Sequence, residues 1–312
     1  MSSQSKTAQQ PVSGKNADKV FKGVAYACGI LILVVLAAVA LFLLFRAWPL
    51  IGGDQKANSA TISNFTGGKV SSFWGYVGPL LFGTVLISAL ALLISFFVSV
   101  GIALFISHYA PKKLATALSY VVDLLAAIPS VIYGLWGGLV LVPAIYPFWN
   151  WVAKYLGWIP IFAGPAANPS RTVATVSVVL AVMILPIITS MSRDIFLQTP
   201  RLQEEAALAL GCAPRQAFFK VILPEISPAI LSAFLICLTY SIDDFMISYF
   251  NCGTVETLPI AIYSMTRKKV SPEIYALSTI MFVVILSVIL VSNAMESRSY
   301  RRDQKTLRKE GA

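Results

Sequence analysis

The sequence predicts an all-α polytopic membrane protein with six transmembrane helices. Composition is the first reason, because 57% of the residues are hydrophobic and 12% are charged, against about 45–50% and about 25% in soluble domains. The second is a set of long apolar segments, since a helix needs about 20 apolar residues to cross a hydrocarbon layer of about 30 Å. The third is that the Lys and Arg residues, which outnumber the acids and give a net charge of +10, gather outside these segments.

The first predicted span covers residues 23–46 and has no charged residue between Val24 and Phe45. This run is longer than the apolar region of a signal peptide, so we expect the helix to be retained. Residues 1–22 before it are predicted to form a polar cytoplasmic tail. Residues 23–77 then make up the first helix and an external loop rich in Gly, Asn, Ser and Thr.

Residues 78–295 are predicted to form the transmembrane core. The remaining spans are expected at 78–107, 118–145, 172–191, 227–250 and 273–295. The third of the six spans contains Pro129, and its Gly134 and Gly138 have the four-residue spacing that permits another helix to approach closely. The Trp-rich stretch 146–171 is expected to contain a short helix in the membrane interface, and 251–272 is expected to be a loop.

The placement of positive charge predicts the topology. Basic residues concentrate in loops on the cytoplasmic side of a membrane, and here most of them lie before the first span, in the second and fourth loops, and in the basic cytoplasmic tail 296–312. Six spans then put both termini in the cytoplasm. The triplet 267–269 is an exception, because this topology assigns it to the outside. Basic residues are not interleaved with aromatic ones as a nucleic-acid stacking surface requires, so we expect no nucleic acid among the partners.

Several kinds of chemistry are not expected of this chain. The four cysteines are scattered over different segments, which predicts neither a disulfide framework nor a metal site, and His108 is the one histidine. The phosphate-cradling pattern G-x-x-x-x-G-K-[ST] is absent. We therefore expect a protein that is not an enzyme, has no cofactor of its own and carries no catalytic residues.

A polar helix-turn-helix is predicted within the loop 192–226. Glu204 and Glu205 begin a helix where acidic side chains complement the helix dipole, and Gly211 is suited to end it in the left-handed conformation. Pro214 can open a second helix. The expected apolar face consists of Leu208, Phe218, Phe219 and Ile222. Two short helices with an apolar face suggest a surface that docks on another protein.

The loop resembles the signature of permease subunits of ATP-binding-cassette importers. The matching residues, in order along the chain, are Glu205, Ala206, Ala207, Gly211, Val221, Leu223 and Pro224. The resemblance implies the transmembrane fold of type I importers and a bacterial plasma membrane location. It also implies that the loop couples to two cytoplasmic ATPase subunits, which use ATP and Mg²⁺. The other implied partners are a second permease subunit, or a second copy of this one, and an external substrate-binding protein.

Two permease families are resembled in different parts of the chain. Residues 18–210 resemble phosphate-importer permeases, through stretches such as 122-VDLLAAIPSVIYGLWG and 159-IPIFAGPAANPSRT. Residues 211–312 resemble the second permease of spermidine/putrescine importers, through 236-ICLTYSIDDFMISYF and 257-TLPIAIYSMTRKKVSPEIYALSTI. The resemblance implies import of phosphate in the first place, with polyamine import or a chimera of the two, natural or constructed, as alternatives.

Asp243 and Asp244 are the candidate residues of the substrate path. Charged groups cost about 2.5–3.5 kcal/mol each at the centre of a membrane helix, so acids there usually have a function. If both faced the path, they would favour a polycation and repel phosphate. The alternative is that they lie near the outer end of the fifth span and cap a helix.

Overall fold

The protein consists of helices and turns. The computed structural model describes residues 15–52, 68, 70, 72–159, 164–198, 201–267 and 272–310, and no strand occurs among them. The α-helices are α1 (Lys15–Ile51), α3 (Phe73–Leu104), α4 (Lys112–Ala126), α5 (Ser130–Trp136), α6 (Val142–Ala144), α7 (Tyr146–Leu156), α8 (Val173–Gln198), α9 (Arg201–Ala209), α10 (Pro214–Ala217), α11 (Leu223–Asp243), α12 (Phe245–Asn251), α13 (Leu258–Thr266) and α14 (Pro272–Glu310). Three π-helical turns join them: η1 (Phe105–Tyr109), η2 (Gly137–Leu141) and η3 (Phe218–Ile222).

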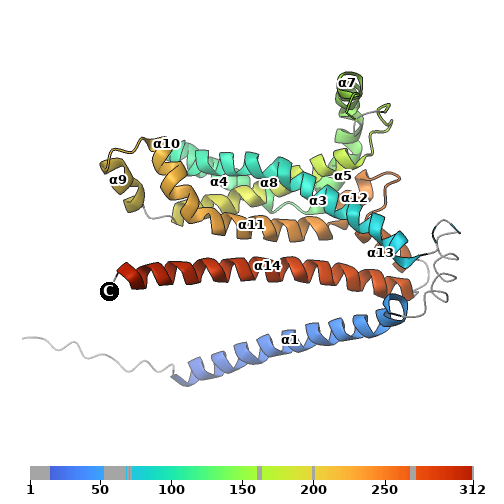
Figure 1. Ribbon diagram of the computed structural model, residues 1–312, viewed down its shortest axis with the longest axis horizontal. Helices are drawn as coiled ribbons and strands as arrows, with labels where there is room; N and C mark the ends of the chain where they lie inside the picture. The colour runs from blue at the N-terminus through green and yellow to red at the C-terminus, as the bar shows by residue number, and fades with distance from the viewer. Residues whose placement is uncertain are drawn as a thin grey trace, which may run out of the picture.

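The long helices run side by side and form an elongated bundle (Figure 1). Five helices are long and apolar enough to cross a membrane, and the bent pair of α4 with the segment Ser130–Ala144 gives a sixth crossing if it counts as one. The six predicted spans are therefore all found as helical segments. The start of α1, the end of α14 and the pair α9–α10 lie at one end of the bundle, and α7 lies at the other.

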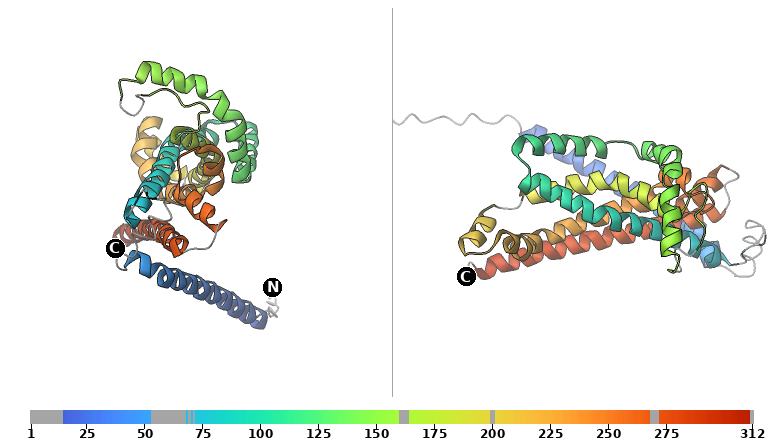
Figure 2. Two further views of the ribbon diagram at one scale, coloured as in Figure 1. Left: turned by 90° about the vertical axis from the view of Figure 1, so that its right-hand side faces the viewer. Right: turned by 90° about the horizontal axis from the view of Figure 1, so that it is seen from above.

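The core of the bundle is the contact of α8 with α3 and α11. In the most apolar stretch of 18 residues, 61% of the residues of α8 are buried, whereas none of those of α1 are. Helix α1 packs on α14 at the edge of the bundle (Figure 2). Small hydroxyl side chains line the contact of α3 with α8, and Ser99 donates a hydrogen bond to the backbone oxygen of Leu185 over 2.9 Å. Small residues permit the close approach on which helix association in lipid depends.

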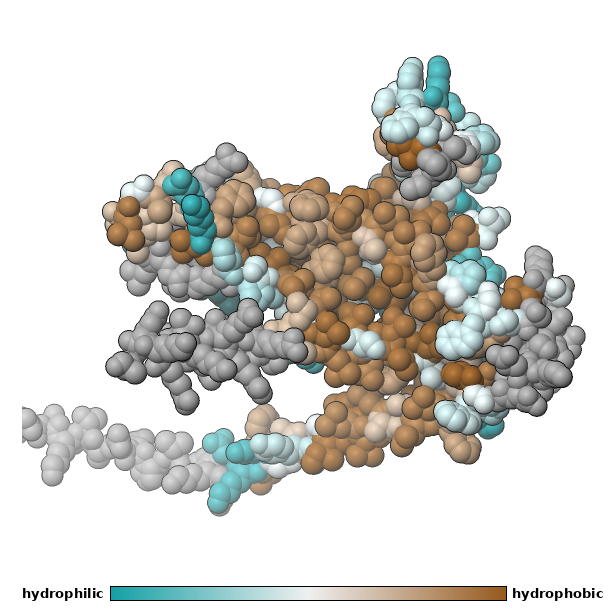
Figure 3. Space-filling model, in the orientation of Figure 1, coloured by the Kyte–Doolittle hydropathy of each residue, from teal (hydrophilic) through white to brown (hydrophobic). Residues whose placement is uncertain are grey.

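The outer surface of the bundle is mainly apolar, and polar residues gather at its two ends (Figure 3). Side chains such as Phe45, Phe97 and Leu139 are exposed. In water such a surface would favour aggregation, whereas hydrocarbon accommodates it. The fold thus agrees with the composition.

The third span, predicted over 118–145, is broken. Helix α4 ends at Ala126, α5 begins at Ser130, and the two segments meet at 87°. Pro129 explains the break, because proline has no N–H to donate and its ring disfavours the helical conformation of the residue before it. The sequence contained this signal, but hydropathy does not report a change of direction.

The fifth span, predicted at 227–250, is found, but it is also broken. Helix α11 ends at Asp243, and Asp244 has φ −71° and ψ 100°, which is an extended conformation. Its side chain instead accepts a hydrogen bond from the backbone N–H of Ile247 and caps α12. The predicted loop 251–272 contains a further helix, α13, that the sequence analysis did not expect.

Other element ends extend beyond their predicted limits. Helix α1 begins at Lys15, inside the predicted tail 1–22, and α14 continues to Glu310 through most of the predicted tail 296–312. Helix α8 continues to Gln198, so the first seven residues of the predicted loop 192–226 are helical. The short helix expected within 146–171 is α7. Of the basic triplet 267–269, residues 268 and 269 lie outside the described residues.

Candidate coupling helices and translocation site

Helix α9 ends in a Schellman motif at Gly211. The N–H of Cys212 donates to the oxygen of Ala207 over 3.1 Å, and the N–H of Gly211 donates to the oxygen of Leu208 over 2.9 Å. This pair of bonds satisfies carbonyl groups that a helix end otherwise leaves free. Gly211 has φ +85°, a conformation that glycine adopts without strain. The predicted left-handed end of the helix is confirmed.

The second helix of the loop begins with a local cap and continues as a π-helical turn. The side-chain oxygen of Gln216 accepts a hydrogen bond from the N–H of Ala213, and the N–H of Gln216 donates to the oxygen of Ala213. Helix α10 then continues into η3 and α11, and α9 contacts both α10 and η3. The turn at Gly211 therefore folds α9 back on η3, the turn that contains Val221 of the signature.

The expected apolar face of this loop divides into two parts. Ile222 is buried with Phe196 of α8, and the ring of Phe218 lies 6.3 Å from the ring of Phe196. These two side chains hold the loop on the bundle. Leu208 and Phe219 are 39% and 54% exposed, so they remain available to a partner.

The signature residues occupy both parts of the loop. Exposed ones include Glu205, Ala206, Gly211 and Pro224, whereas Ala207 is buried and Val221 and Leu223 are half-buried. Leu210, which is not in the signature, has the largest exposed fraction of any described large apolar side chain, 86%. A Cβ atom at Gly211 would meet no atom within 4 Å. The tip of the loop is therefore free to contact another protein.

The segments that follow the two breaks pack against each other. Added Cβ atoms at Gly134 and Gly138 would lie 3.0 Å and 3.1 Å from backbone oxygens of α12, so these glycines permit close contact. Asn251, which is fully buried, donates from Nδ2 to the backbone oxygens of Gly134 (3.0 Å) and Ile247 (2.9 Å). The predicted role of the glycine pair is confirmed, and its partner is α12.

The two acids of the candidate path differ in position. Asp244 is partly buried, and its carboxylate accepts hydrogen bonds from the N–H of Ile247 over 2.8 Å and from the hydroxyl of Ser130 at the start of α5. Asp243 is exposed at the last position of α11. Asp244 thus links the two breaks, and only Asp243 has a carboxylate free to face a path or a partner.

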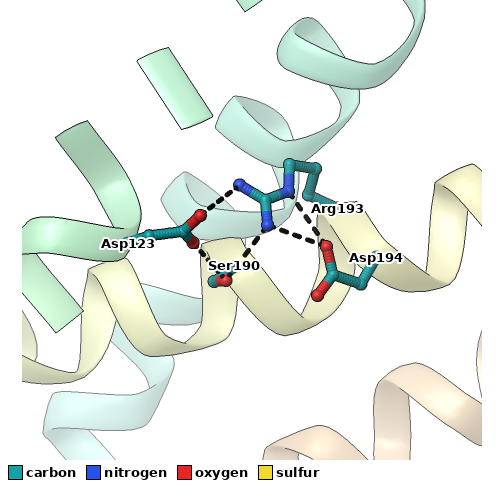
Figure 4. A network of polar contacts seen from close by, with 4 residues as sticks. All are labelled: Asp123, Ser190, Arg193 and Asp194. Atoms are coloured by element: carbon teal, nitrogen blue, oxygen red, sulfur yellow. Dashed lines mark hydrogen bonds and ion pairs between the residues drawn. The ribbon is translucent and has the colours of Figure 1, made fainter. Parts of the chain in front are cut away.

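A charged network that the sequence analysis missed connects α4 with α8 (Figure 4). The guanidinium group of Arg193 donates to Asp194 over 2.8 Å and to Asp123 over 3.3 Å. The hydroxyl of Ser190 donates to Asp123 over 2.7 Å. Arg193 itself is 8% exposed. The only sequence signal was the presence of charge at both positions, which does not reveal a pairing across 70 residues.

The sequence is similar to a family of transport proteins. Residues 99–302 match the family described as "Binding-protein-dependent transport system inner membrane component". The phosphate transport system permease protein PstC 2 of Mycobacterium tuberculosis is 40% identical over 212 residues, which are 67% of this chain and 65% of that protein. The match thus spans slightly less than two thirds of that relative.

A second relative is similar over almost the whole chain. The phosphate transport system permease protein PstC of Xylella fastidiosa is 29% identical over 310 residues, covering 92% of this chain and 93% of that protein. The similarity therefore does not stop near Leu210, where the sequence analysis placed a junction. The comparisons do not favour the polyamine interpretation of residues 211–312.

Two solved transporter structures have a similar fold. An inward-facing conformation of the MetNI methionine ABC transporter has a TM-score of 0.55 at 17% identity and covers 72% of this chain and 95% of that one. A bacterial alginate ABC transporter in complex with a periplasmic protein has a TM-score of 0.55 at 19% identity and covers 93% of this chain and 98% of that one. At these identities the likeness concerns the fold.

Proposed function

This chain belongs to the binding-protein-dependent transport system inner membrane component family, and we propose that it is the permease subunit of an importer for inorganic phosphate. The observation that carries the proposal is the similarity to a phosphate permease over 92% of the chain. Family membership and the helical bundle make it a multi-pass inner membrane protein of transport and not an enzyme. Substrate, partners and orientation belong to the proposal.

The proposed energy input arrives through α9 and α10. The exposed side chains of Leu208, Leu210 and Phe219 offer an apolar contact beside exposed Glu205, and the turn at Gly211 holds the two helices at a fixed angle. Two cytoplasmic ATPase subunits would dock there and hydrolyse ATP with Mg²⁺. Because Ile222 and Phe218 pack on α8, a displacement of the docked loop would move the helices of the bundle as rigid bodies.

The other proposed partners follow from the same assignment. A second permease subunit, identical or not, would complete the translocation path, and an external binding protein would deliver the substrate. The start of α1 and the end of α14 lie at the same end of the bundle as α9. Docking of ATPase subunits there would place both termini in the cytoplasm, as the distribution of positive charge also favours.

The acids are consistent with phosphate transport only if they lie off the path. Asp244 is engaged as a cap, which leaves Asp243 as the exposed carboxylate at the end of α11. A carboxylate repels an anionic substrate at short range. We therefore propose that Asp243 faces water or a partner outside the path.

Uptake of labelled substrate tests the proposal. Cells that lack their own phosphate and polyamine importers would express this chain with the partner subunits of a phosphate importer or of a polyamine importer. We expect uptake of phosphate with the phosphate partners and none of spermidine with either set. Spermidine uptake alone would overturn the choice of substrate, and no uptake of either, with the protein present in the membrane, would contradict a transport role with these partners.

A further inference from the structure

A cavity of about 870 Å³ lies at the end of the bundle that carries α7. It is bounded by α3, by α7, by the segment 164–174 that leads into α8 and by residues 254–255 before α13, and its walls are mainly apolar. The volume lies within the range of small-molecule sites, roughly 300–1,000 Å³. The coupling helices lie at the opposite end of the bundle, so this cavity is separate from them.

The wall formed by α3 runs along the direction in which lipid chains lie. Phe82, Leu86 and Leu90 line the cavity at intervals of four residues, which places them in one stripe of the helix. From Phe82 to Leu90 the helix rises about 12 Å. One leaflet of the hydrocarbon layer is about 15 Å thick, half of about 30 Å. The cavity therefore has an apolar wall whose length approaches the depth of one leaflet.

Helix α7 forms another wall of the cavity and carries the features of an interfacial helix. Trp149 and Val152 line the cavity, while Phe148, Trp151 and Tyr155 are exposed. Aromatic side chains of this kind concentrate at the boundary between hydrocarbon and water, and an amphipathic helix lies in that plane. The hydroxyl of Thr175 on α8 accepts a hydrogen bond from Nε1 of Trp149 over 3.0 Å, which attaches α7 to the bundle.

A cationic group lies at the polar edge of the cavity. Arg171 lines it, is exposed, and stands two residues before the first residue of α8, the most buried of the long apolar helices. Within the described part of the chain, its guanidinium group has no acidic partner. A guanidinium is well suited to bind a phosphate group through two parallel hydrogen bonds. An apolar cavity and an unpaired cation at its edge match the two parts of a phospholipid.

We propose that this cavity is a binding site for one anionic phospholipid, with an acyl chain beside the stripe on α3 and the phosphate at Arg171. The lipid would fill the space beneath α7 and hold this helix against α3. The proposal depends on the membrane location and not on the substrate of the transporter, so it stands or falls separately from phosphate import.

Native mass spectrometry of the purified full chain tests the proposal. The protein in detergent would receive phosphatidylglycerol or phosphatidylethanolamine, and the fraction with retained lipid would be measured. We expect retention of phosphatidylglycerol, lowered about tenfold or more by Arg171→Gln because a charged hydrogen bond is lost. Arg267→Gln is the matched control, since Arg267 is also exposed but does not line the cavity. Leu86→Trp, which fills the cavity, should lower retention of both lipids.

Three outcomes would overturn the proposal. If both lipids are retained equally, and neither Arg171→Gln nor Leu86→Trp changes their retention, lipid binds elsewhere. Displacement of phosphatidylglycerol by millimolar inorganic phosphate, with Leu86→Trp without effect, would make the site one for a free anion. If a second copy of the chain is retained in place of lipid, and Leu86→Trp abolishes this retention, the cavity is a contact between proteins. Thermal unfolding of each variant checks that it is folded.

Discussion

Nη1 of Arg193 on α8 lies 3.3 Å from Oδ2 of Asp123 on α4, and this ion pair joins the two helices close to the break that follows Ala126. Helix α4 packs chiefly on α8 and η1, and beyond Ala126 the chain turns by 87°. The side chain of Arg193 is 10% exposed and that of Asp123 is 47% exposed. The pair therefore fixes α4 against α8 at a point where solvent reaches one of the two partners.

Replacing Arg193 should weaken this attachment. We expect Arg193→Ala to lower the free energy of unfolding by roughly 1–3 kcal/mol, because two carboxylates and Ser190 lose a charged donor. The measurement is unfolding of the purified protein in detergent. The free energy of unfolding of Arg193→Lys should lie between that of the unchanged protein and that of Arg193→Ala, since an ammonium group cannot reproduce the planar contacts of a guanidinium group. The exchange Asp123→Arg with Arg193→Asp should be less harmful than Arg193→Asp alone, although Asp194 then faces a second carboxylate. An exchange as harmful as Arg193→Asp would contradict the role of the pair.

Substitutions at Gly211 separate the turn from the docking surface. Gly211→Ala should lower the free energy of unfolding by roughly 1–2 kcal/mol because φ at this position is positive, whereas Asn and Asp tolerate this conformation better. We expect Gly211→Asp to abolish phosphate uptake while leaving membrane insertion intact, because it adds a charge at the proposed contact with the ATPase. Gly211→Asn should retain more uptake. Normal uptake by the Asp variant would contradict the proposed role of this loop.

The tight contact at Gly137 predicts a sharp difference between two glycines. A Cβ atom there would lie 2.7 Å from Cγ2 of Val179 and 2.8 Å from Oδ1 of Asn251, whereas one at Gly101 would meet nothing within 4 Å. Gly137→Ala should destabilise the protein by about 1–3 kcal/mol. Gly101→Ala should be neutral or stabilising, because alanine favours helix. Equal free energies of unfolding of the two variants in detergent would show that the packing around Gly137 is loose.

The two adjacent acids should respond differently to substitution. Asp244→Ala removes a helix cap and should cost about 0.5–2 kcal/mol of stability, while Asp244→Asn should be nearly neutral because asparagine also caps helices. Asp243→Asn should leave stability unchanged and phosphate uptake equal or improved. A loss of phosphate uptake in Asp243→Asn, with the protein folded and inserted, would place this carboxylate in the path.

The cysteines should differ in their reaction with thiol reagents. Burial raises the pKa of Cys252 to about 11, although a hydrogen bond with Ser248 acts in the opposite direction. The reactive thiolate is favoured only above the pKa, so at pH 8 roughly one Cys252 thiol in a thousand is ionised. We expect a maleimide to label Cys212, which is partly exposed, well before Cys252. Equal labelling rates would show that α12 opens readily.

The sequence allowed the prediction of features that depend on local chemistry. Six apolar segments, the helix end at Gly211 and the packing role of Gly134 and Gly138 each follow from the residue types and their spacing. Glycine at a helix end and small residues at intervals of four have few structural uses, and the structure confirms all three.

Features that depend on distant contacts were not predictable in this way. The partner of Arg193 is Asp123, 70 residues earlier, and the helix of the glycine pair meets α12 more than 100 residues later. The breaks were missed for a different reason. Pro129 and Asp244 were visible, but a hydropathy average over 20 residues remains high whether the chain continues or turns. Helix α13 was missed because nine residues are too few to produce a clear pattern.

The breaks in the third and fifth spans have a consequence for the bilayer itself. Each interruption leaves several backbone N–H and C=O groups without helical partners, and hydrocarbon offers them none. The Asp244 carboxylate accepts from the N–H of Ile247, and the hydroxyl of Tyr133 donates to the backbone oxygen of Leu125 at the end of α4. Turns within the chain satisfy others, such as the N–H of Ile128, which donates to the oxygen of Leu125. Any group that stays open needs water or a neighbouring subunit. The surroundings of the starts of α5 and α12 therefore cannot be uniformly hydrocarbon. Water should reach deeper into the membrane there than anywhere along α1.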